Sequence, residues 1–211
     1  MNKFHVTVAS AMLAAAASSA LGANLLVNAG FEDPVLGGGD VFGAVGWNVF
    51  GGGTFTIKVA PRSGDNAFKT FGAASGAFQD FAASEGQMYK ASAYALNPSF
   101  DAMAGAQIAA VNIEWRDAGN NLISFITQQI LSASSPQGAT ALDYAYGEIM
   151  GVAPAGTATA RFVIITGAFA GPGGGAPFFD DASFELIPAP SAALAGLLTV
   201  GVVAGRRRRI G

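Results

Sequence analysis

The sequence has no cysteine, and its one histidine, His5, lies close to the start of the chain. Without thiols the chain can form neither disulfides nor thiolate metal sites. Beyond His5 there is no imidazole, so a Ser-His-Asp triad, a Cys-His pair and an ordinary zinc site are excluded from the rest of the sequence. An enzyme built from these residues would have to rely on carboxylates.

Long hydrophobic runs are also missing. The apolar run 6–20 follows Lys3 and falls short of a comfortable membrane span, which takes about 20 residues. A positive start, a short apolar run and small residues after it predict a helical secretory signal peptide over 1–23. The alternative is a short buried helix at the start of the fold. Several cleavage positions are open, at the small residues Ser18, Ala20, Gly22 and Ala23.

The C-terminal residues 188–211 combine prolines, an apolar run and a basic block. Pro188 and Pro190 precede the apolar run 192–204, and the chain then continues with Arg206, Arg207, Arg208 and Arg209. The run is again short for a membrane-spanning helix, and the arginines are typical of a stop on the cytoplasmic side.

This order of features resembles the PEP-CTERM sorting tail of exported bacterial proteins. The resemblance implies a hydrophobic helix, an exosortase-type processing enzyme as partner, transient anchoring in the inner membrane, and delivery to the cell envelope or the outside. Ala189 stands where the usual motif has glutamate. A plain membrane anchor and a buried C-terminal helix are the alternatives.

Positive charge is scarce between these two segments. Outside Lys3 and the arginine block, the sequence has six lysines and arginines in total, against fourteen aspartates and glutamates. The chain has no basic stripe, so nucleic acid and anionic lipid are poor candidate partners. An acidic balance suits a bound cation. The segment 24–187 has the size of one ordinary domain that can bury a core.

Short alternating segments cut by glycine dominate this domain. We predict nine to eleven strands and find no amphipathic helical pattern, which favours an all-β, antiparallel jelly-roll sandwich. Two segments, "TFTIKVA" and "VNIEWRD", alternate most cleanly; their predicted inward residues are Phe55, Ile57, Val59, Val111, Ile113 and Trp115.

Seven motifs follow one another in an order that resembles carbohydrate-binding modules of the family 4/9/22 type, which are galactose-binding-like jelly rolls. They are "NLLVNAGFEDP", "GWNVFGGG", "RSGDNAFK", "EGQMYKASAYA", "IEWRDAGNNLI", "APAGTATARFVI" and "FFDDASFEL". The resemblance implies the jelly-roll fold, extracellular polysaccharide as a ligand, and a structural calcium that ties the first strand and an early loop to the last strand.

Strand parity independently suggests a cation site. In "FFDDASFEL", Asp180 is expected to share the core-facing side with Phe184, and Asp181 to point the opposite way. A buried carboxylate needs a partner. Glu32 could meet Asp180, and calcium, which accepts six to eight oxygens, would relieve their repulsion. The resemblance adds Gly30, Ser63 and Asp65 as further ligands. The alternative is that the acids pair with Arg62 or Lys90, or lie in water.

Exposed aromatic rings are the candidates for sugar stacking. Tyr144 and Tyr146 share a strand face and could form a platform. Trp47 is a weaker candidate, because it also reads as a core residue. Four outward polar residues are candidates for lining a cleft, with ordinary solvated strand faces as the alternative: Gln79, Asn112, Glu114 and Arg116.

No pair of carboxylates has the arrangement that glycoside hydrolysis needs. Asp117, close to Glu114, reads as a turn residue, and Asp180 and Asp181 are expected on opposite faces. We therefore expect a non-catalytic protein of the cell envelope or extracellular matrix with a carbohydrate-binding-like domain. A structural or adhesive component without a sugar site is the alternative, and a carboxylate glycosidase is the third reading.

Overall fold

The structure is a computed structural model, and it describes residues 22–188. This part of the chain contains eleven strands and one short 3-10 turn, η1 (Ala141–Asp143). The strands are β1 (Val41–Phe42), β2 (Asn48–Phe50), β3 (Thr54–Ile57), β4 (Ala67–Thr70), β5 (Ala74–Ala82), β6 (Met88–Leu96), β7 (Ala104–Arg116), β8 (Leu122–Ser132), β9 (Ala145–Val152), β10 (Thr159–Gly174) and β11 (Phe178–Ile187).

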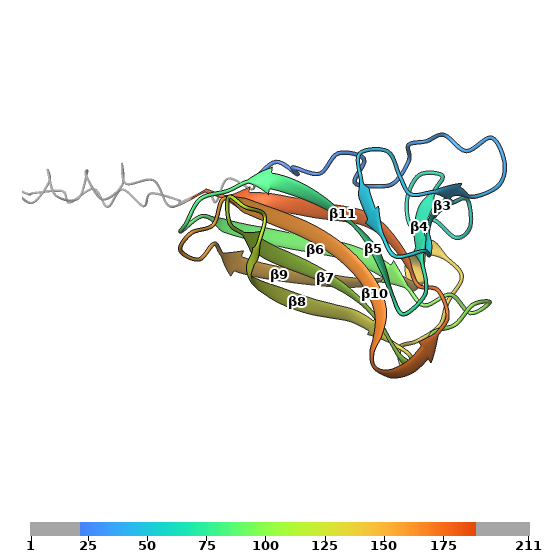
Figure 1. Ribbon diagram of the computed structural model, residues 1–211. Helices are drawn as coiled ribbons and strands as arrows, with labels where there is room; N and C mark the ends of the chain where they lie inside the picture. The colour runs from blue at the N-terminus through green and yellow to red at the C-terminus, as the bar shows by residue number, and fades with distance from the viewer. Residues whose placement is uncertain (1–21, 189–211) are drawn as a thin grey trace, which may run out of the picture.

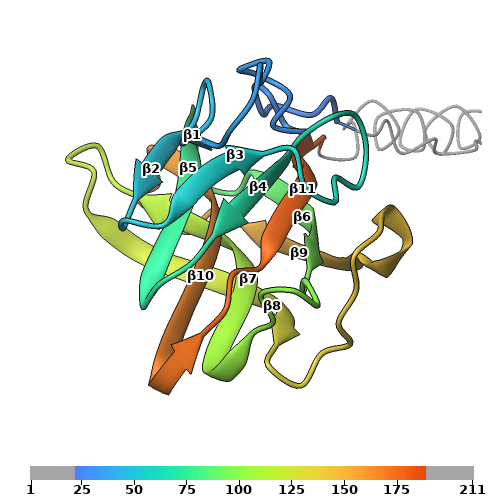
Figure 2. The ribbon, with the colours of Figure 1, turned by 90° about the vertical axis from the view of Figure 1, so that its right-hand side faces the viewer.

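The strands form two antiparallel sheets packed face to face (Figure 1, Figure 2). Sheet A has the order β1-β3-β4-β11-β6-β9, and sheet B has the order β2-β5-β10-β7-β8. The all-β jelly-roll sandwich expected from the sequence is confirmed. The helices expected in 1–23 and 188–211 fall outside the described residues, apart from a few positions at their inner ends. Between residues 22 and 188, no helix is long and apolar enough to cross a membrane.

The core lies between the sheets, where the alternating residues of the strands meet. Val111, Ile113 and Trp115 are all buried there, as predicted, and Phe162 of β10 and Phe184 of β11 pack against each other in the same cluster with ring centroids 5.7 Å apart. The polar side chains of Asn112 and Glu114 on β7, and of Arg161 on β10, alternate with these residues and face away from the core.

The prediction for "TFTIKVA" is wrong in part. Thr54 and Thr56 are fully buried, whereas Val59 lies beyond the end of β3 and is 45% exposed. Both faces of β3 are covered, because Phe55 and Ile57 belong to a second apolar cluster. The hydroxyl of Thr56 donates to the carbonyl oxygen of Gly43 at 2.7 Å, so this polar side chain is accommodated in a buried position.

A β-bulge in β11 overturns the parity argument for the acids. Asp180 pairs with Tyr94 on β6, but the next register pair is Ser183 with Ser92, and Asp181 between them has a φ of +44°. The bulge therefore places Asp180 on the outer face of sheet A rather than on the core face, although Phe184 beyond it still faces the core.

The first described segment runs alongside the last strand. The side chain of Asn24 donates to the carbonyl oxygen of Ala182 at 2.9 Å and accepts from the amide of Phe184 at 3.0 Å. The amide of Leu25 donates to the carbonyl oxygen of Phe184 at 2.8 Å. The two described ends of the chain consequently lie side by side at one end of the sandwich (Figure 1).

Candidate functional site

Glu32 and Asp180, the two acids expected to meet, hold the same loop, residues 61–66. Asp180 accepts the backbone N–H groups of Arg62 at 2.8 Å and Ser63 at 3.2 Å. Glu32 accepts the backbone N–H of Asp65 at 2.9 Å. The loop between β3 and β4 therefore ties an acid near the start of the domain to an acid in its last strand.

Gly64 allows Glu32 to approach the loop closely, and Gly30 marks the point where three acidic side chains converge. An ideal Cβ on Gly64, whose φ is +60°, would lie 2.3 Å from Oε1 of Glu32. An ideal Cβ on Gly30 would lie 3.7 Å from Oδ1 of Asp181, 3.9 Å from Oδ1 of Asp180 and 3.8 Å from Cγ of Glu32. Three acidic side chains thus gather around the small space beside Gly30.

The other predicted ligands take different roles. The hydroxyl of Ser63 donates to Oδ1 of Asp181 at 2.7 Å, and Arg62 forms an ion pair with the same carboxylate. Asp65 meets Glu32 through its backbone N–H, and Asp65 itself is exposed. Asp181 was expected to point away from this cluster; instead the bulge turns it toward the loop.

Asp180 is the electrostatically unusual member of the cluster. It is fully buried, and within residues 22–188 it forms no ion pair, because Arg62 is engaged with Asp181. Burial raises the pKa of Asp180 to about 7, the nearby charge of Asp181 adds to the rise, and the N–H groups of Ser63 and Arg62 counteract it. A cation beside Asp180 would favour its ionised form.

Side chains alone do not complete a metal site. Within the described part of the chain, no three acidic or imidazole side chains are arranged so that they could hold a metal ion. The cluster around Gly30 does supply the hard oxygen donors that calcium accepts, which include main-chain carbonyls. A calcium ion would therefore need carbonyl ligands in addition to Glu32 and Asp180.

The two tyrosines predicted as a platform differ in exposure. Tyr144 precedes β9, is 9% exposed and packs on the outer face of sheet A, where its hydroxyl donates to the carbonyl oxygen of Ala60 at 2.8 Å. Burial raises the pKa of Tyr144, and the charges of Asp180 and Asp181 raise it further. The platform prediction is wrong for Tyr144, because its ring serves as the cover of an apolar cluster. Tyr146 is 50% exposed.

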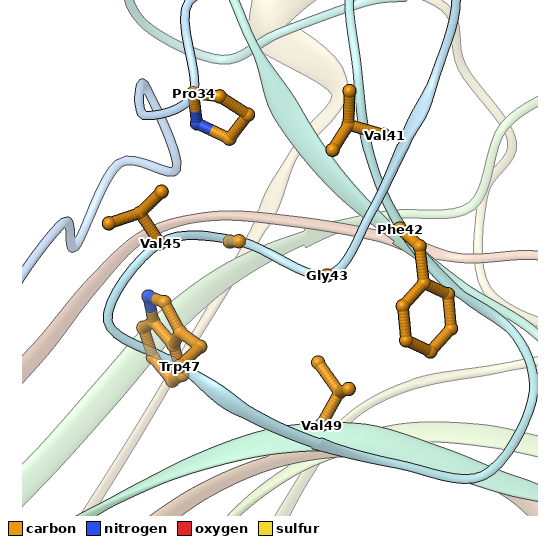
Figure 3. A pocket seen from close by; sticks show the side chains of 8 residues that line it. Pro34, Val41, Phe42, Gly43, Val45, Trp47 and Val49 are labelled. Atoms are coloured by element: carbon orange, nitrogen blue, oxygen red, sulfur yellow. The ribbon is translucent and has the colours of Figure 1, made fainter.

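Trp47 is a core residue, as its alternative reading had it. Its ring stacks on Phe31 with centroids 5.0 Å apart, and its Nε1 donates to the carbonyl oxygen of Asn28 at 3.0 Å. One side of Trp47 borders a pocket of about 260 Å³ (Figure 3). The other lining residues are Pro34, Val41, Phe42, Gly43, Ala44, Val45 and Val49. These side chains offer no groups that could bond sugar hydroxyls.

The outer face of sheet B combines exposed rings with polar side chains in regular rows. One row runs across four strands through Asp80, Arg161, Glu114 and Phe125. Arg161 bonds both carboxylate oxygens of Asp80, at 2.6 and 2.8 Å, and its Cζ lies 3.7 Å from the ring centroid of Phe78. Phe125, at the edge of the row, is 57% exposed.

The next row on this face runs through Phe78, Val163, Asn112 and Thr127, and its two central side chains are buried. Val163 and Asn112 in its centre are 2% and 8% exposed although they face away from the core. The hydroxyl of Thr127 donates to the side-chain carbonyl of Asn112 at 2.5 Å, and Phe78 flanks Val163 on the other side. Neighbouring side chains therefore shield the centre of the face, and the polar atoms of Asn112 and Thr127 lie there.

The structure corrects the predicted cleft residues. Asn112 and Glu114 do face outward, and Arg116 pairs with Glu114 at 2.6 Å. Gln79 faces inward instead, because its amide bonds both the N–H and the carbonyl of Val27. Sequence reasoning missed Phe78, Asp80, Phe125 and Thr127 as members of this face. The alternation in "ASGAFQDFA" was the available signal for Phe78 and Asp80.

No protein-family model matches the chain, and no curated protein sequence matches it. Solved structures do. A xylan-binding CBM22 domain of Paenibacillus barcinonensis is 16% identical with a TM-score of 0.52, over 80% of this chain and 97% of that domain. A cyclase from Fischerella sp. TAU is 12% identical with a TM-score of 0.58, over 79% and 98%.

The enzymatically active domain of tailspike protein 4 of bacteriophage CBA120 is 15% identical with a TM-score of 0.54. The match covers 78% of this chain but only 21% of the tailspike chain. At such low identities the likeness establishes the fold alone. The chain has the β-sandwich fold that is found in a carbohydrate-binding module and also in a cyclase and in part of a tailspike protein.

Proposed function

We propose that this chain is a non-catalytic, exported protein of the cell envelope or extracellular matrix that binds polysaccharide on the outer face of sheet B. The observation that carries the proposal is the combination on one sheet face of an exposed ring, Phe125, with the shielded amide of Asn112 and a row of charged side chains. Sugar rings stack on such aromatic faces while polar groups bond their hydroxyls.

The charges of this face favour a neutral glycan. Arg161 is paired with Asp80, and Arg116 is paired with Glu114, so neither arginine is left to attract an anionic ligand. The same pairs present oxygen and nitrogen atoms at fixed positions, which suits hydroxyl groups along an extended sugar chain. The fold shared with a xylan-binding domain supports this ligand class without naming the sugar.

The carboxyl groups support a role without catalysis. A glycosidase needs one protonated and one ionised carboxyl group on either side of the scissile bond. Asp180 is the carboxyl whose pKa is raised to about 7, but it is buried beneath the loop 61–66 and is out of reach of a substrate. Asp80 and Glu114, on the open face, are each held by an arginine.

Calcium is the structural part of the proposal. Glu32 and Asp180 supply carboxylate oxygens, and the carbonyl of Gly30 and groups of Ser63 and Asp65 in the loop complete the shell, as the family resemblance implies. The ion neutralises the buried carboxylate of Asp180 and the half-buried carboxylate of Glu32, and it fastens the loop to both ends of the domain. The lack of an ion partner for the buried carboxylate of Asp180 within residues 22–188 supports this assignment.

Delivery of the domain depends on the ends of the chain. The signal peptide 1–23 directs export, and the segment 188–211 acts as the sorting tail that an exosortase-type enzyme processes after transient membrane anchoring. Pulse-labelling of the chain in its host tests this step. Two successive losses of mass, one at each end, are expected; a single mature species that retains the arginine block would contradict it.

A structural or adhesive role is the second candidate, because β1 of sheet A and the loop between β6 and β7 also expose apolar rings. Phe42 and Phe100 are 55% and 58% exposed, and Phe42 packs edge-on against Phe55 at 5.7 Å. Exposed apolar patches of this kind often mark contacts between proteins. Self-association in the absence of any glycan signal would favour this candidate.

A glycan array separates the two functions. We expect the full-length chain to bind neutral, extended polysaccharides, and Phe125→Ala to weaken this binding. Phe100→Ala is the matched control, since Phe100 and Phe125 are 58% and 57% exposed, but Phe100 lies in the loop between β6 and β7 and packs against Phe178 of sheet A. Silence of the wild-type chain across neutral and acidic glycans, or equal losses in both variants, would refute the proposed site.

A further inference from the structure

The outer face of sheet A carries a second aromatic and polar surface. Three of its residues form one cross-strand row, with Asp180 on β11, Tyr94 on β6 and Tyr146 on β9. The next row contains Ser183, Ser92 and Glu148. Tyr144 and the loops around it cover the apolar part of this face but leave Tyr146 50% exposed.

The rings of this surface are held in place. Tyr94 and Tyr146 contact each other with centroids 4.9 Å apart, and Cζ of Arg62 lies 3.3 Å from the centroid of Tyr94. Arg62 is itself fixed by its ion pair with Asp181. The hydroxyl of Tyr146 donates to Glu148 at 2.6 Å, which restrains the exposed ring. Binding to a fixed ring costs little conformational entropy.

Hydrogen-bond donors and acceptors surround the exposed ring of Tyr146. Lys90 lies 3.9 Å from Glu148 and 3.4 Å from Glu185, and Ser183 donates to Glu185 at 2.9 Å. Oε2 of Glu185 is buried without a hydrogen-bond partner in the described part of the chain. Both cations of this surface, Lys90 and Arg62, are therefore paired with carboxylates, and the carboxylates outnumber them.

We propose that this surface is a second binding site for a neutral glycan, centred on Tyr146, and that one molecule of the protein bridges two polysaccharide chains. The ligand class rests on the proposed function, whereas the site stands on its own residues. A neutral, hydroxyl-rich ligand fits because Lys90 and Arg62 are already paired with carboxylates, while Tyr146 offers a ring face for stacking.

Bridging follows from the architecture. The two sites lie on the outer faces of two sheets that pack against each other, about 10 Å apart in such sandwiches, so they face in opposite directions. One molecule can therefore hold two separate chains, and no dimer is needed.

Calorimetric titration of the full-length chain with xylohexaose and cellohexaose counts the sites. We expect two molecules of the bound hexasaccharide per wild-type chain and one per chain in either Tyr146→Ala or Phe125→Ala. Tyr146→Phe keeps the ring and retains two sites with a modest loss of affinity. The tyrosine site, measured in Phe125→Ala, weakens roughly tenfold or more when Tyr146 is also replaced by alanine.

Turbidity of a soluble neutral xylan on addition of protein tests bridging. Wild-type chain should precipitate the polysaccharide with an optimum in the protein-to-glycan ratio, while Tyr146→Ala should bind without precipitating it. One site in the wild-type titration, or unchanged precipitation by Tyr146→Ala, overturns the second site and leaves the proposed function standing. No binding of any hexasaccharide or polysaccharide overturns both.

Discussion

Replacement of Asp180 by asparagine probes the electrostatics of the buried acid. In the metal-free chain the folded pKa of Asp180 is about 7 against an ordinary value of 3.8. The folded state therefore holds this proton more tightly than the unfolded state does. The favourable contribution is complete below the unfolded pKa and is lost as pH rises through the folded pKa, in a window from about pH 4 to about pH 7.

The size of the effect follows from the two pKa values. A rise of about three pKa units, at about 1.4 kcal/mol per unit, corresponds to an upper limit of about 4 kcal/mol lost across this window. Asp180→Asn cannot ionise, so the variant should lack this slope. In EDTA at pH 8 it should be more stable than the wild type, and at pH 4 the two should be similar.

Urea unfolding at several pH values in EDTA measures the slope. Asp117→Asn is the control of opposite sign, because the side-chain and backbone hydrogen bonds from Asn121, with that of Gly119, lower the pKa of Asp117. The stabilisation that Asp117 contributes is complete above its ordinary pKa and is lost as pH falls through its lowered folded pKa. Equal pH slopes for Asp180→Asn and the wild type would refute the reasoning about the buried carboxyl.

Three further substitutions test the packing that positions the sites. Gly64→Ala should lower the melting temperature by an amount equivalent to about 1–2 kcal/mol or more, since its φ of +60° and the close Glu32 carboxylate disfavour a Cβ, whereas Gly52→Ala, with open space around it, should not. Phe162→Ala should cost about 3–5 kcal/mol in urea unfolding, because the ring is fully buried between the sheets. Tyr144→Phe should cost about 1 kcal/mol through the lost bond to Ala60 and leave glycan affinity unchanged; a loss of affinity would contradict the assignment of Tyr144 as a cover.

The alternation of Val111, Ile113 and Trp115 was sufficient to predict a strand of the sandwich, because β7 is an interior strand of sheet B with one face in the core. The same reasoning failed at Asp180. A bulge adds one residue and reverses the side on which the neighbours lie, and nothing in "FFDDASFEL" announces it.

Tyr144 shows a second limit of sequence reasoning. Its burial depends on the loop at Ala60, which is distant in sequence and packs over the outer face of sheet A. Glu32 could be placed with the last strand only through the family resemblance. Phe125 and Arg161 share a row that depends on the pairing order of four strands, and a single sequence does not provide this order.

Amide chemical-shift mapping with a bound neutral hexasaccharide tests most directly the claim that glycan lies on the outer face of sheet B. The account predicts the largest shifts at Asn112, Phe125 and Thr127, and no shifts at Val45 or Val49 beside the apolar pocket. Shifts confined to the pocket residues, with Asn112 and Phe125 unmoved, would contradict it.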